Sequence, residues 1–228
     1  MKRIAVLQSN FIPWKGYFDL IAKVDSFILY DDMQFTRRDW RNRNKIKTSK
    51  GAEWVTIPVS VKGKYFQAIN QTVVSDPLWG KKIWKTIQFN YSASPYFEVL
   101  APLLQDSFIN PESIYLSNIN RDLISKINSY LGISTEIRDS REFDLRGDKS
   151  ERLLNLVRDA GGDSYVSGPA AKEYLDTGLF LEGGVEVEWF DYSGYECYPQ
   201  LWGEFIHEVT ILDLLFNCGP GSRDYLKM

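Results

Sequence analysis

The first 35 residues constrain the fold most, because two short apolar segments flank a stretch with helical spacing. Arg3–Leu7 is the first apolar run, residues 16–21 have apolar positions at helical spacing, and Phe27–Tyr30 is the second run. Apolar runs this short, on either side of a helix, are typical of buried parallel strands joined by a right-handed crossover. The chain therefore begins with a predicted β-α-β unit.

The alternation continues to the end of the chain. Strands are predicted at 54–59, 66–74, 134–138, 164–167 and 185–190, and helices at 77–105, 119–131, 148–160 and 205–216. Strands that alternate with helices predict an α/β fold with a mainly parallel sheet and helices on both faces. The length of 228 residues fits one domain, 1–228, whose helical middle, about 77–131, forms a lid or an inserted subdomain.

Composition excludes several classes of protein. No stretch of about 18 apolar residues predicts a membrane-spanning helix, and the apolar run of Arg3–Leu7 is too short for a secretory signal. Two cysteines are too few for a disulfide scaffold, which favours a reducing compartment. The net charge of −3 disfavours general binding to nucleic acid. We therefore expect a cytoplasmic protein with no integral membrane segment and no nucleic-acid partner.

The segment from Gln8 to Tyr17 joins the first strand to the first helix, where doubly wound folds bind ligands. Free backbone N–H groups at a helix start suit an anion or a phosphate. Gln8 and Asn10 carry amides that can orient a ligand, and Gly16 permits a close approach to the helix start. The alternative is a simple turn whose Asn and Pro only shape the backbone.

Two acidic residues, Asp31 and Asp32, follow the second predicted strand. Because adjacent strand residues point to opposite faces, at most one of these carboxylates enters a site. Asp32 is the candidate base or Mg²⁺ ligand, and a cap for the following turn is its alternative role.

Positive charge is concentrated just after this acidic pair. The seven basic residues there are Arg37, Arg38, Arg41, Arg43, Lys45, Lys47 and Lys50. A planar guanidinium binds phosphate in a fixed bidentate geometry, and Trp40, Asn42 and Asn44 are interleaved with the charges. This pattern favours Arg41, Arg43 and Asn44 as residues that bind a nucleotide or sugar phosphate, although a charge run is often only a solvated face.

A second loop of the same kind follows the predicted strand 164–167. Ser167 and Gly168 suit anion contact through the backbone, and a helix cap by Ser167 is the alternative. His207 is the only histidine, which excludes sites that need two imidazoles. Its apolar neighbours favour a structural role over a general base, and the order of residues makes a Cys218–His207 nucleophile pair the weaker hypothesis.

Five segments carry a resemblance to a known family. They are Gln8–Ile21 (QSNFIPWKGYFDLI), Tyr30–Phe35 (YDDMQF), Trp40–Asn44 (WRNRN), Tyr165–Gly168 (YVSG) and Leu212–Asn217 (LDLLFN). On these residues the chain resembles the WbqC-like family of bacterial surface-polysaccharide gene clusters, and the resemblance extends over essentially the whole chain. It implies a role in O-antigen (lipopolysaccharide) or capsule biosynthesis, with an acyl, aminoacyl or glycyl transferase activity.

The strand, proline-containing loop, glycine and helix at the start are also similar to nucleotidylyltransferase and pantothenate-synthetase-type folds, which are Rossmann-like. Those folds contact ATP phosphates through a His-x-Gly-His motif. This chain has Trp14-Lys15-Gly16-Tyr17 at that place, so both histidines are absent.

Two hypotheses of different classes follow. In the first, the chain is a transferase acting on a nucleotide-linked sugar or another phosphorylated small molecule, with an activated acyl donor or ATP with Mg as co-reactant. Its candidate catalytic residues are Asp32, Lys15 and His207, with Lys15 also helping Arg41 and Arg43 to hold phosphates. In the second, the chain is a non-catalytic nucleotide-sugar-binding or assembly-partner module that has lost the histidines.

Overall fold

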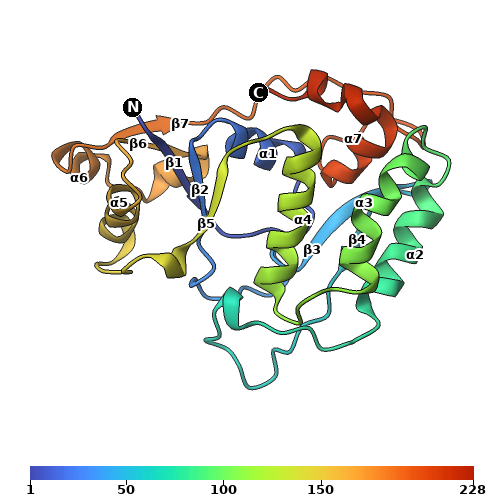
Figure 1. Ribbon diagram of the computed structural model, residues 1–228, viewed down its shortest axis with the longest axis horizontal. Helices are drawn as coiled ribbons and strands as arrows, with labels where there is room; N and C mark the ends of the chain where they lie inside the picture. The colour runs from blue at the N-terminus through green and yellow to red at the C-terminus, as the bar shows by residue number, and fades with distance from the viewer.

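The computed structural model describes residues 1–228, and its centre is a five-stranded parallel sheet in the order β5-β2-β1-β6-β7 (Figure 1). The strands are β1 (Arg3–Leu7), β2 (Ser26–Leu29), β5 (Glu136–Asp139), β6 (Ser164–Ser167) and β7 (Glu186–Trp189). The chain runs from β1 outward to β2 and β5, then returns to place β6 against the other side of β1. The carboxyl ends of β1 and β6 therefore flank the switch point where such sheets bind ligands.

Helices cover both faces of the sheet, as the alternation predicted. One face packs against α1 (Lys15–Ala22), α4 (Leu116–Leu131) and α7 (Ile211–Cys218), and the other against α5 (Lys149–Asp159) and α6 (Thr177–Glu182). Neighbouring side chains of β1 separate accordingly: Ala5 joins the first core, and Ile4 and Val6 join the second. The α/β class with a mainly parallel, doubly covered sheet is confirmed.

The helical middle differs from the prediction in one respect. The expected helix at 77–105 is two helices, α2 (Trp79–Tyr91) and α3 (Phe97–Ile109), because Pro95 disfavours helical backbone at the residue before it. Buried side chains of α2, α3 and α4 belong to the same apolar cluster as Ala5 of the central sheet. The helical middle thus shares its core with one face of the sheet.

The basic segment folds as a strand that the sequence did not predict. β3 (Arg43–Thr48) pairs antiparallel with β4 (Gly51–Thr56), and this hairpin is separate from the main sheet. The strand expected at 54–59 therefore belongs to the hairpin and ends at Thr56. The strand expected near 66–74 is reduced to isolated bridges, such as Val59 with Val74.

The last helix also starts later than predicted. Residues 190–210 contain no helix or strand, and α7 begins at Ile211 because the Thr210 hydroxyl accepts a hydrogen bond from the Leu212 N–H. Short 3₁₀ turns occupy Ile69–Gln71, Ser140–Glu142, Pro169–Glu173 and Gly219–Tyr225. None of the helices combines the length and the apolar character needed to span a membrane.

Candidate functional site

Residues 8–14, which we call the first loop, leave β1 at the switch point and are held by hydrogen bonds from distant segments. The Ser9 N–H donates to Asp31 Oδ1 at 2.8 Å, and the Phe11 N–H donates to the Trp40 carbonyl at 2.9 Å. Both Phe11 and the following isoleucine are fully buried. The first loop is therefore a fixed part of the structure and presents its exposed side chains in one arrangement.

Asn44, on β3, clamps the middle of the first loop. Its Nδ2 donates to the carbonyl oxygens of Phe11 at 3.0 Å and Ile12 at 2.8 Å, and its Oδ1 accepts from the Lys45 N–H. Ile12 has a φ of 37°, a conformation that β-branched residues rarely adopt. The polar atoms of Asn44 thus stabilise a strained loop, and the role of Asn44 in ligand binding stays a prediction.

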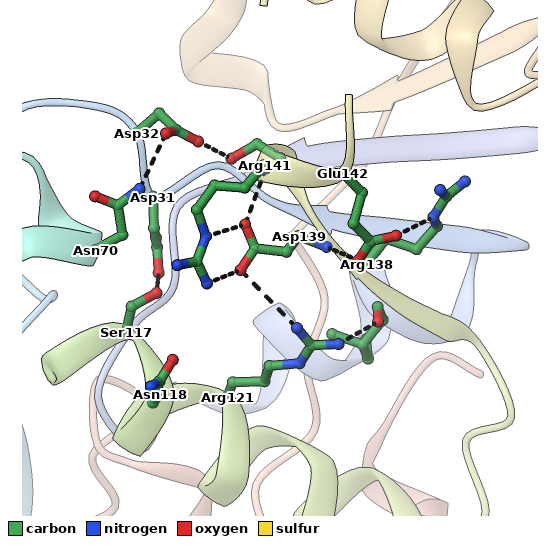
Figure 2. A network of polar contacts seen from close by, with 12 residues as sticks. Asp31, Asp32, Asn70, Ser117, Asn118, Arg121, Arg138, Asp139, Arg141 and Glu142 are labelled. Atoms are coloured by element: carbon green, nitrogen blue, oxygen red, sulfur yellow. Dashed lines mark hydrogen bonds and ion pairs between the residues drawn. The ribbon is translucent and has the colours of Figure 1, made fainter. Parts of the chain in front are cut away.

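The acidic pair after β2 diverges, as expected for adjacent residues (Figure 2). Asp31 is 1% exposed and accepts hydrogen bonds from the first loop and from the Ser117 hydroxyl on α4. Burial raises the pKa of Asp31, and these hydrogen bonds oppose that rise. Asp32 instead accepts from Asn70 Nδ2 at 3.0 Å and from the Ser140 hydroxyl. Asp31 is therefore a buried residue that holds the first loop, and Asp32, at the carboxyl end of β2, is only partly buried.

Two arginines balance the acidic residues at this edge (Figure 2). Arg141 donates from Nε and Nη2 to Asp139 at 2.9 and 2.6 Å, and Arg121 lies 3.9 Å from the same carboxylate. Burial alone would raise the pKa of Asp139, but the hydrogen bonds and charges of these arginines bring it below its ordinary value. The hydrogen bond to Asp139, with a smaller contribution from the charge of Asp32, raises the pKa of Arg141. None of these arginines was singled out from the sequence.

A pocket of about 360 Å³ opens on one side of the first loop, and we call it the tryptophan pocket. Its lining residues are Asn10, Pro13, Trp14, Trp40, Asn44 and Glu208. Asn10 Oδ1 accepts from the Arg41 guanidinium, which lies 3.7 Å from Asp39 Oδ2. Since Asn10 Nδ2 has no partner in the protein, this pocket offers one oriented amide donor beside two indole rings.

Aromatic side chains extend the wall of the tryptophan pocket outward. The rings of Trp40 and Trp54 are 5.1 Å apart, and the Arg43 guanidinium lies 3.9 Å above the Trp54 ring. Gly16 also makes a close approach within the protein, because a Cβ there would lie 2.4 Å from the Trp14 ring. The close approach at the start of α1 is thus made by an indole of the pocket wall.

A second pocket, of about 440 Å³, lies at the ends of β1 and β6, on the face covered by α5; we call it the tyrosine pocket. Its lining residues are Val6, Leu7, Gln8, Tyr30, Met33, Lys149, Arg152, Leu153, Tyr165 and Tyr174. It combines three tyrosines, two cations and the Gln8 side chain, with no acidic residue. The sequence analysis found Gln8 but missed Lys149 and Arg152, whose i, i+3 spacing at a helix start was the available signal.

The three predicted catalytic residues do not form one cluster: Lys15 and His207 lie near each other, and Asp32 is bonded to neither. Lys15 is 3% exposed, and its Nζ donates to the Glu196 carbonyl at 3.0 Å, so desolvation lowers its pKa. Burial and the charge of Lys15 lower the pKa of His207 in the same neighbourhood. No hydrogen bond or ion pair joins Asp32 to either residue. Burial also raises the pKa of Cys218 to about 11, which disfavours a Cys218 thiolate nucleophile.

The loop after β6 is a 3₁₀ turn rather than a helix start. Gly168 occupies the N-cap position and makes no side-chain cap, so Ser167 is not the cap that the sequence allowed. The Ser167 carbonyl accepts from the Phe190 N–H at 2.8 Å. A Cβ at Gly168 would come within 3.3 Å of the Tyr192 ring. Both residues lie at the switch point, but no hydrogen bond joins them to the first loop.

Outside these pockets the structure offers no stronger candidate for a site. No group of three or more histidine, cysteine or acidic side chains comes together in a way that could hold a metal ion. A polar hollow of about 450 Å³, with Ser107 and Asp122 in its wall, contains no residue of the first loop. The two pockets beside the first loop are therefore the candidate site.

Comparison with known proteins places the chain in a family. The model of the WbqC-like protein family matches residues 8–225. The uncharacterized protein Rv1507c of Mycobacterium tuberculosis is 51% identical over 227 residues, which cover all of this chain and 98% of that protein. No solved structure matches. Because the family model covers nearly the whole chain and a full-length relative shares half of its residues, the chain belongs to the WbqC-like protein family.

Proposed function

We propose that this protein is a cytoplasmic transferase of bacterial surface-polysaccharide biosynthesis that attaches an acyl or aminoacyl group to a nucleotide-linked sugar. The observation that carries the proposal is the pair of pockets that residues of the first loop help to line. One pocket offers aromatic faces and an amide, and the other offers aromatic rings and cations. A nucleotide-linked sugar combines the two chemistries that these linings suit.

The tryptophan pocket suits the sugar. Indole rings such as Trp14 and Trp40 provide large apolar faces for the C–H groups of a pyranose, and a few polar groups then fix its orientation. Asn10 is the polar group best prepared for this task, because Arg41 holds its Oδ1 and leaves Nδ2 free to donate to a sugar oxygen. The amide is thus oriented before the ligand binds.

The tyrosine pocket suits the nucleotide. Lys149 and Arg152 lie one turn apart at the start of α5, where backbone N–H groups add to the positive field. The Tyr174 ring, which is 67% exposed, offers a face for a base, and the lining has no carboxylate to repel a diphosphate. The positively charged wall is therefore matched to phosphate groups.

Asp32 is the proposed base. Its carboxylate lies at the carboxyl edge of β2, held by Asn70 and Ser140. As the sugar hydroxyl or amine attacks the carbonyl of an activated acyl donor, Asp32 would accept the proton that the nucleophile loses, and the donor's leaving group would depart. ATP with Mg is the alternative means of activating the acyl group.

Calorimetric titration with a nucleotide-linked sugar, its nucleoside diphosphate and the free sugar tests whether the tryptophan pocket binds the sugar and the tyrosine pocket binds the nucleotide. Replacing Lys149 and Arg152 by alanine should weaken diphosphate binding by about 1–3 kcal/mol per charged contact without affecting the free sugar. Asn10→Ala should weaken binding of the sugar portion. Lys85→Ala, on the exposed face of α2, is the matched control. Unchanged affinity in both pocket variants would refute the site.

The second candidate, a non-catalytic nucleotide-sugar-binding module, is favoured by the separation of Asp32 from Lys15 and His207. Such a module would bind the same ligands as the transferase. Mass spectrometry of the sugar after incubation with activated acyl donors separates the two, because only the transferase increases the mass of the sugar.

A further inference from the structure

Two aromatic side chains on one loop are largely exposed to solvent. Tyr65 is 74% exposed and Phe66 is 84% exposed, and their rings pack edge to face at 5.0 Å. Figure 1 shows the segment between β4 and α2 as a loop that projects beyond the rest of the molecule at its lower edge. Neither pocket beside the first loop includes these residues. Their exposure is therefore unexplained by the proposed function.

The loop is held in place by hydrogen bonds to its base. Gln34 Nε2 donates to the Tyr65 carbonyl at 2.8 Å, and Arg37 Nη2 donates to the Val61 carbonyl at 3.3 Å. The buried Gln67 side chain closes the loop by donating to the Ser60 carbonyl. The aromatic pair is consequently presented to the outside by an ordered loop.

The part of the chain that carries the aromatic pair is rich in positive charge. Between residues 33 and 66 the chain has nine lysines and arginines but only two acidic residues, although its total net charge is −3. The exposed cations on and beneath the loop are Arg37, Arg38, Lys62 and Lys64. None of these four forms an ion pair. Four unpaired cations thus lie on the loop of the two exposed rings or on the segment that holds its base, and we call these six residues the basic aromatic surface.

We propose that the basic aromatic surface docks the protein on an anionic lipid bilayer. Tyr65 and Phe66 would enter the headgroup region, where aromatic rings are stable in membrane interfaces. The flanking lysines can keep their ammonium groups at the lipid phosphates while their apolar stems follow the rings inward. The cations beneath the loop would add attraction to a negatively charged leaflet.

A bilayer fits this surface better than a nucleic acid does. Single-stranded nucleic acid is usually bound in a positively charged groove in which bases stack on ring faces. Here the two rings are exposed on a projecting loop, and the edge of one faces the ring of the other at an interplanar angle of 89°. A projecting loop suits a planar partner.

A hydrogen bond and two aromatic contacts also connect this surface to the tryptophan pocket. The Arg38 carbonyl accepts from Arg43, whose guanidinium lies over the Trp54 ring beside Trp40. Docking through the loop would therefore hold the rim of the tryptophan pocket close to the membrane surface. The docking itself does not depend on the proposed transferase activity.

Vesicle flotation of the full chain tests the proposal with phosphatidylcholine alone and with phosphatidylcholine mixed with phosphatidylglycerol. The wild-type protein should float only with the anionic vesicles, and high salt should release it. The double variants Tyr65→Ser/Phe66→Ser and Lys62→Glu/Lys64→Glu should each reduce bound protein by about tenfold or more.

Matched controls come from α2, where Phe89 is 82% exposed and Lys81 and Lys85 are also exposed. Phe89→Ser and Lys81→Glu/Lys85→Glu make the same chemical changes elsewhere and should float like the wild type. Failure of the wild type to bind anionic vesicles, or equal losses in the control variants, would overturn the proposal. Binding of a fluorescent single-stranded oligonucleotide, lost in the loop variants while vesicles stay unbound, would overturn it in favour of nucleic acid.

Discussion

Asn44→Asp is the sharpest test of how the first loop is built. The substitution keeps the shape of the side chain but replaces the Nδ2 donor, which is bound to the Phe11 and Ile12 carbonyls, with an acceptor oxygen. A carboxylate at this position, which is 3% exposed, would face two carbonyl oxygens with no cation paired to it. The comparison variant Asn44→Ala removes the donor without adding charge.

The expected magnitudes differ between the two variants. Asn44→Ala leaves two buried carbonyl oxygens without donors, at about 1–3 kcal/mol each, or about 2–4 kcal/mol after partial relaxation. Asn44→Asp adds an uncompensated buried charge, for which about 3–5 kcal/mol is typical. Because the pKa of this new carboxyl would be raised in the folded state, the stability of Asn44→Asp should fall as the pH rises from acid to neutral.

Urea unfolding of both variants and the wild type, at neutral pH and near pH 5, measures these differences. The loss for Asn44→Asp should shrink at the lower pH, where the folded state takes up a proton, while the loss for Asn44→Ala should stay constant. Equal losses in the two variants with no dependence on pH would refute the clamp, as would a folded Asn44→Asp protein with wild-type stability.

Four further outcomes are expected. Arg41→Ala and Asn10→Ala should each weaken binding of a nucleotide-linked sugar by about 1–3 kcal/mol, and the double variant by little more, because Arg41 acts through Asn10; additive losses in calorimetry would contradict this. Asn10→Ala should leave the melting temperature nearly unchanged, and a large drop would make the residue structural. Gly80→Ala should destabilise the protein by about 1–3 kcal/mol in urea unfolding, since its Cβ would lie 1.6 Å from the Phe108 carbonyl oxygen, and wild-type stability would exclude that close packing. Because burial raises the folded-state pKa of Asp31, the wild type should gain stability relative to Asp31→Asn as the pH falls toward about 4; a difference constant with pH would show that Asp31 does not titrate this way.

The sequence predicted the main sheet because its strands are short, apolar and regularly separated by helical segments. Arg3–Leu7 and Phe27–Tyr30 need no distant information to be recognised as buried strands. β3 was missed because Arg-Asn-Lys-Ile-Lys-Thr carries a single apolar residue, Ile46. That strand depends on tertiary contacts, such as the burial of Ile46 and the hydrogen bonds of Asn44, which no local pattern reveals.

The candidate site was predicted only in part, for the same reason. Gln8 and Asn10 follow directly from the end of a strand, and both line pockets in the structure. Lys149 and Tyr174 reach the tyrosine pocket only because the chain returns to place β6 beside β1, an order that the sequence pattern does not specify. Lys15 has the expected position in the chain, but residues 195–198 cover it.

Mass spectrometry of the sugar product tests the central claim most directly. The purified protein is incubated with nucleotide-linked sugars and activated acyl or aminoacyl donors, and the mass of each sugar is followed over time. The proposed transferase should increase the mass of one sugar by the acyl group, and Asp32→Asn, in which the base is lost, should abolish this gain while the sugar still binds. A nucleotide-linked sugar that binds but gains no mass with any donor would contradict the transferase and leave a binding module.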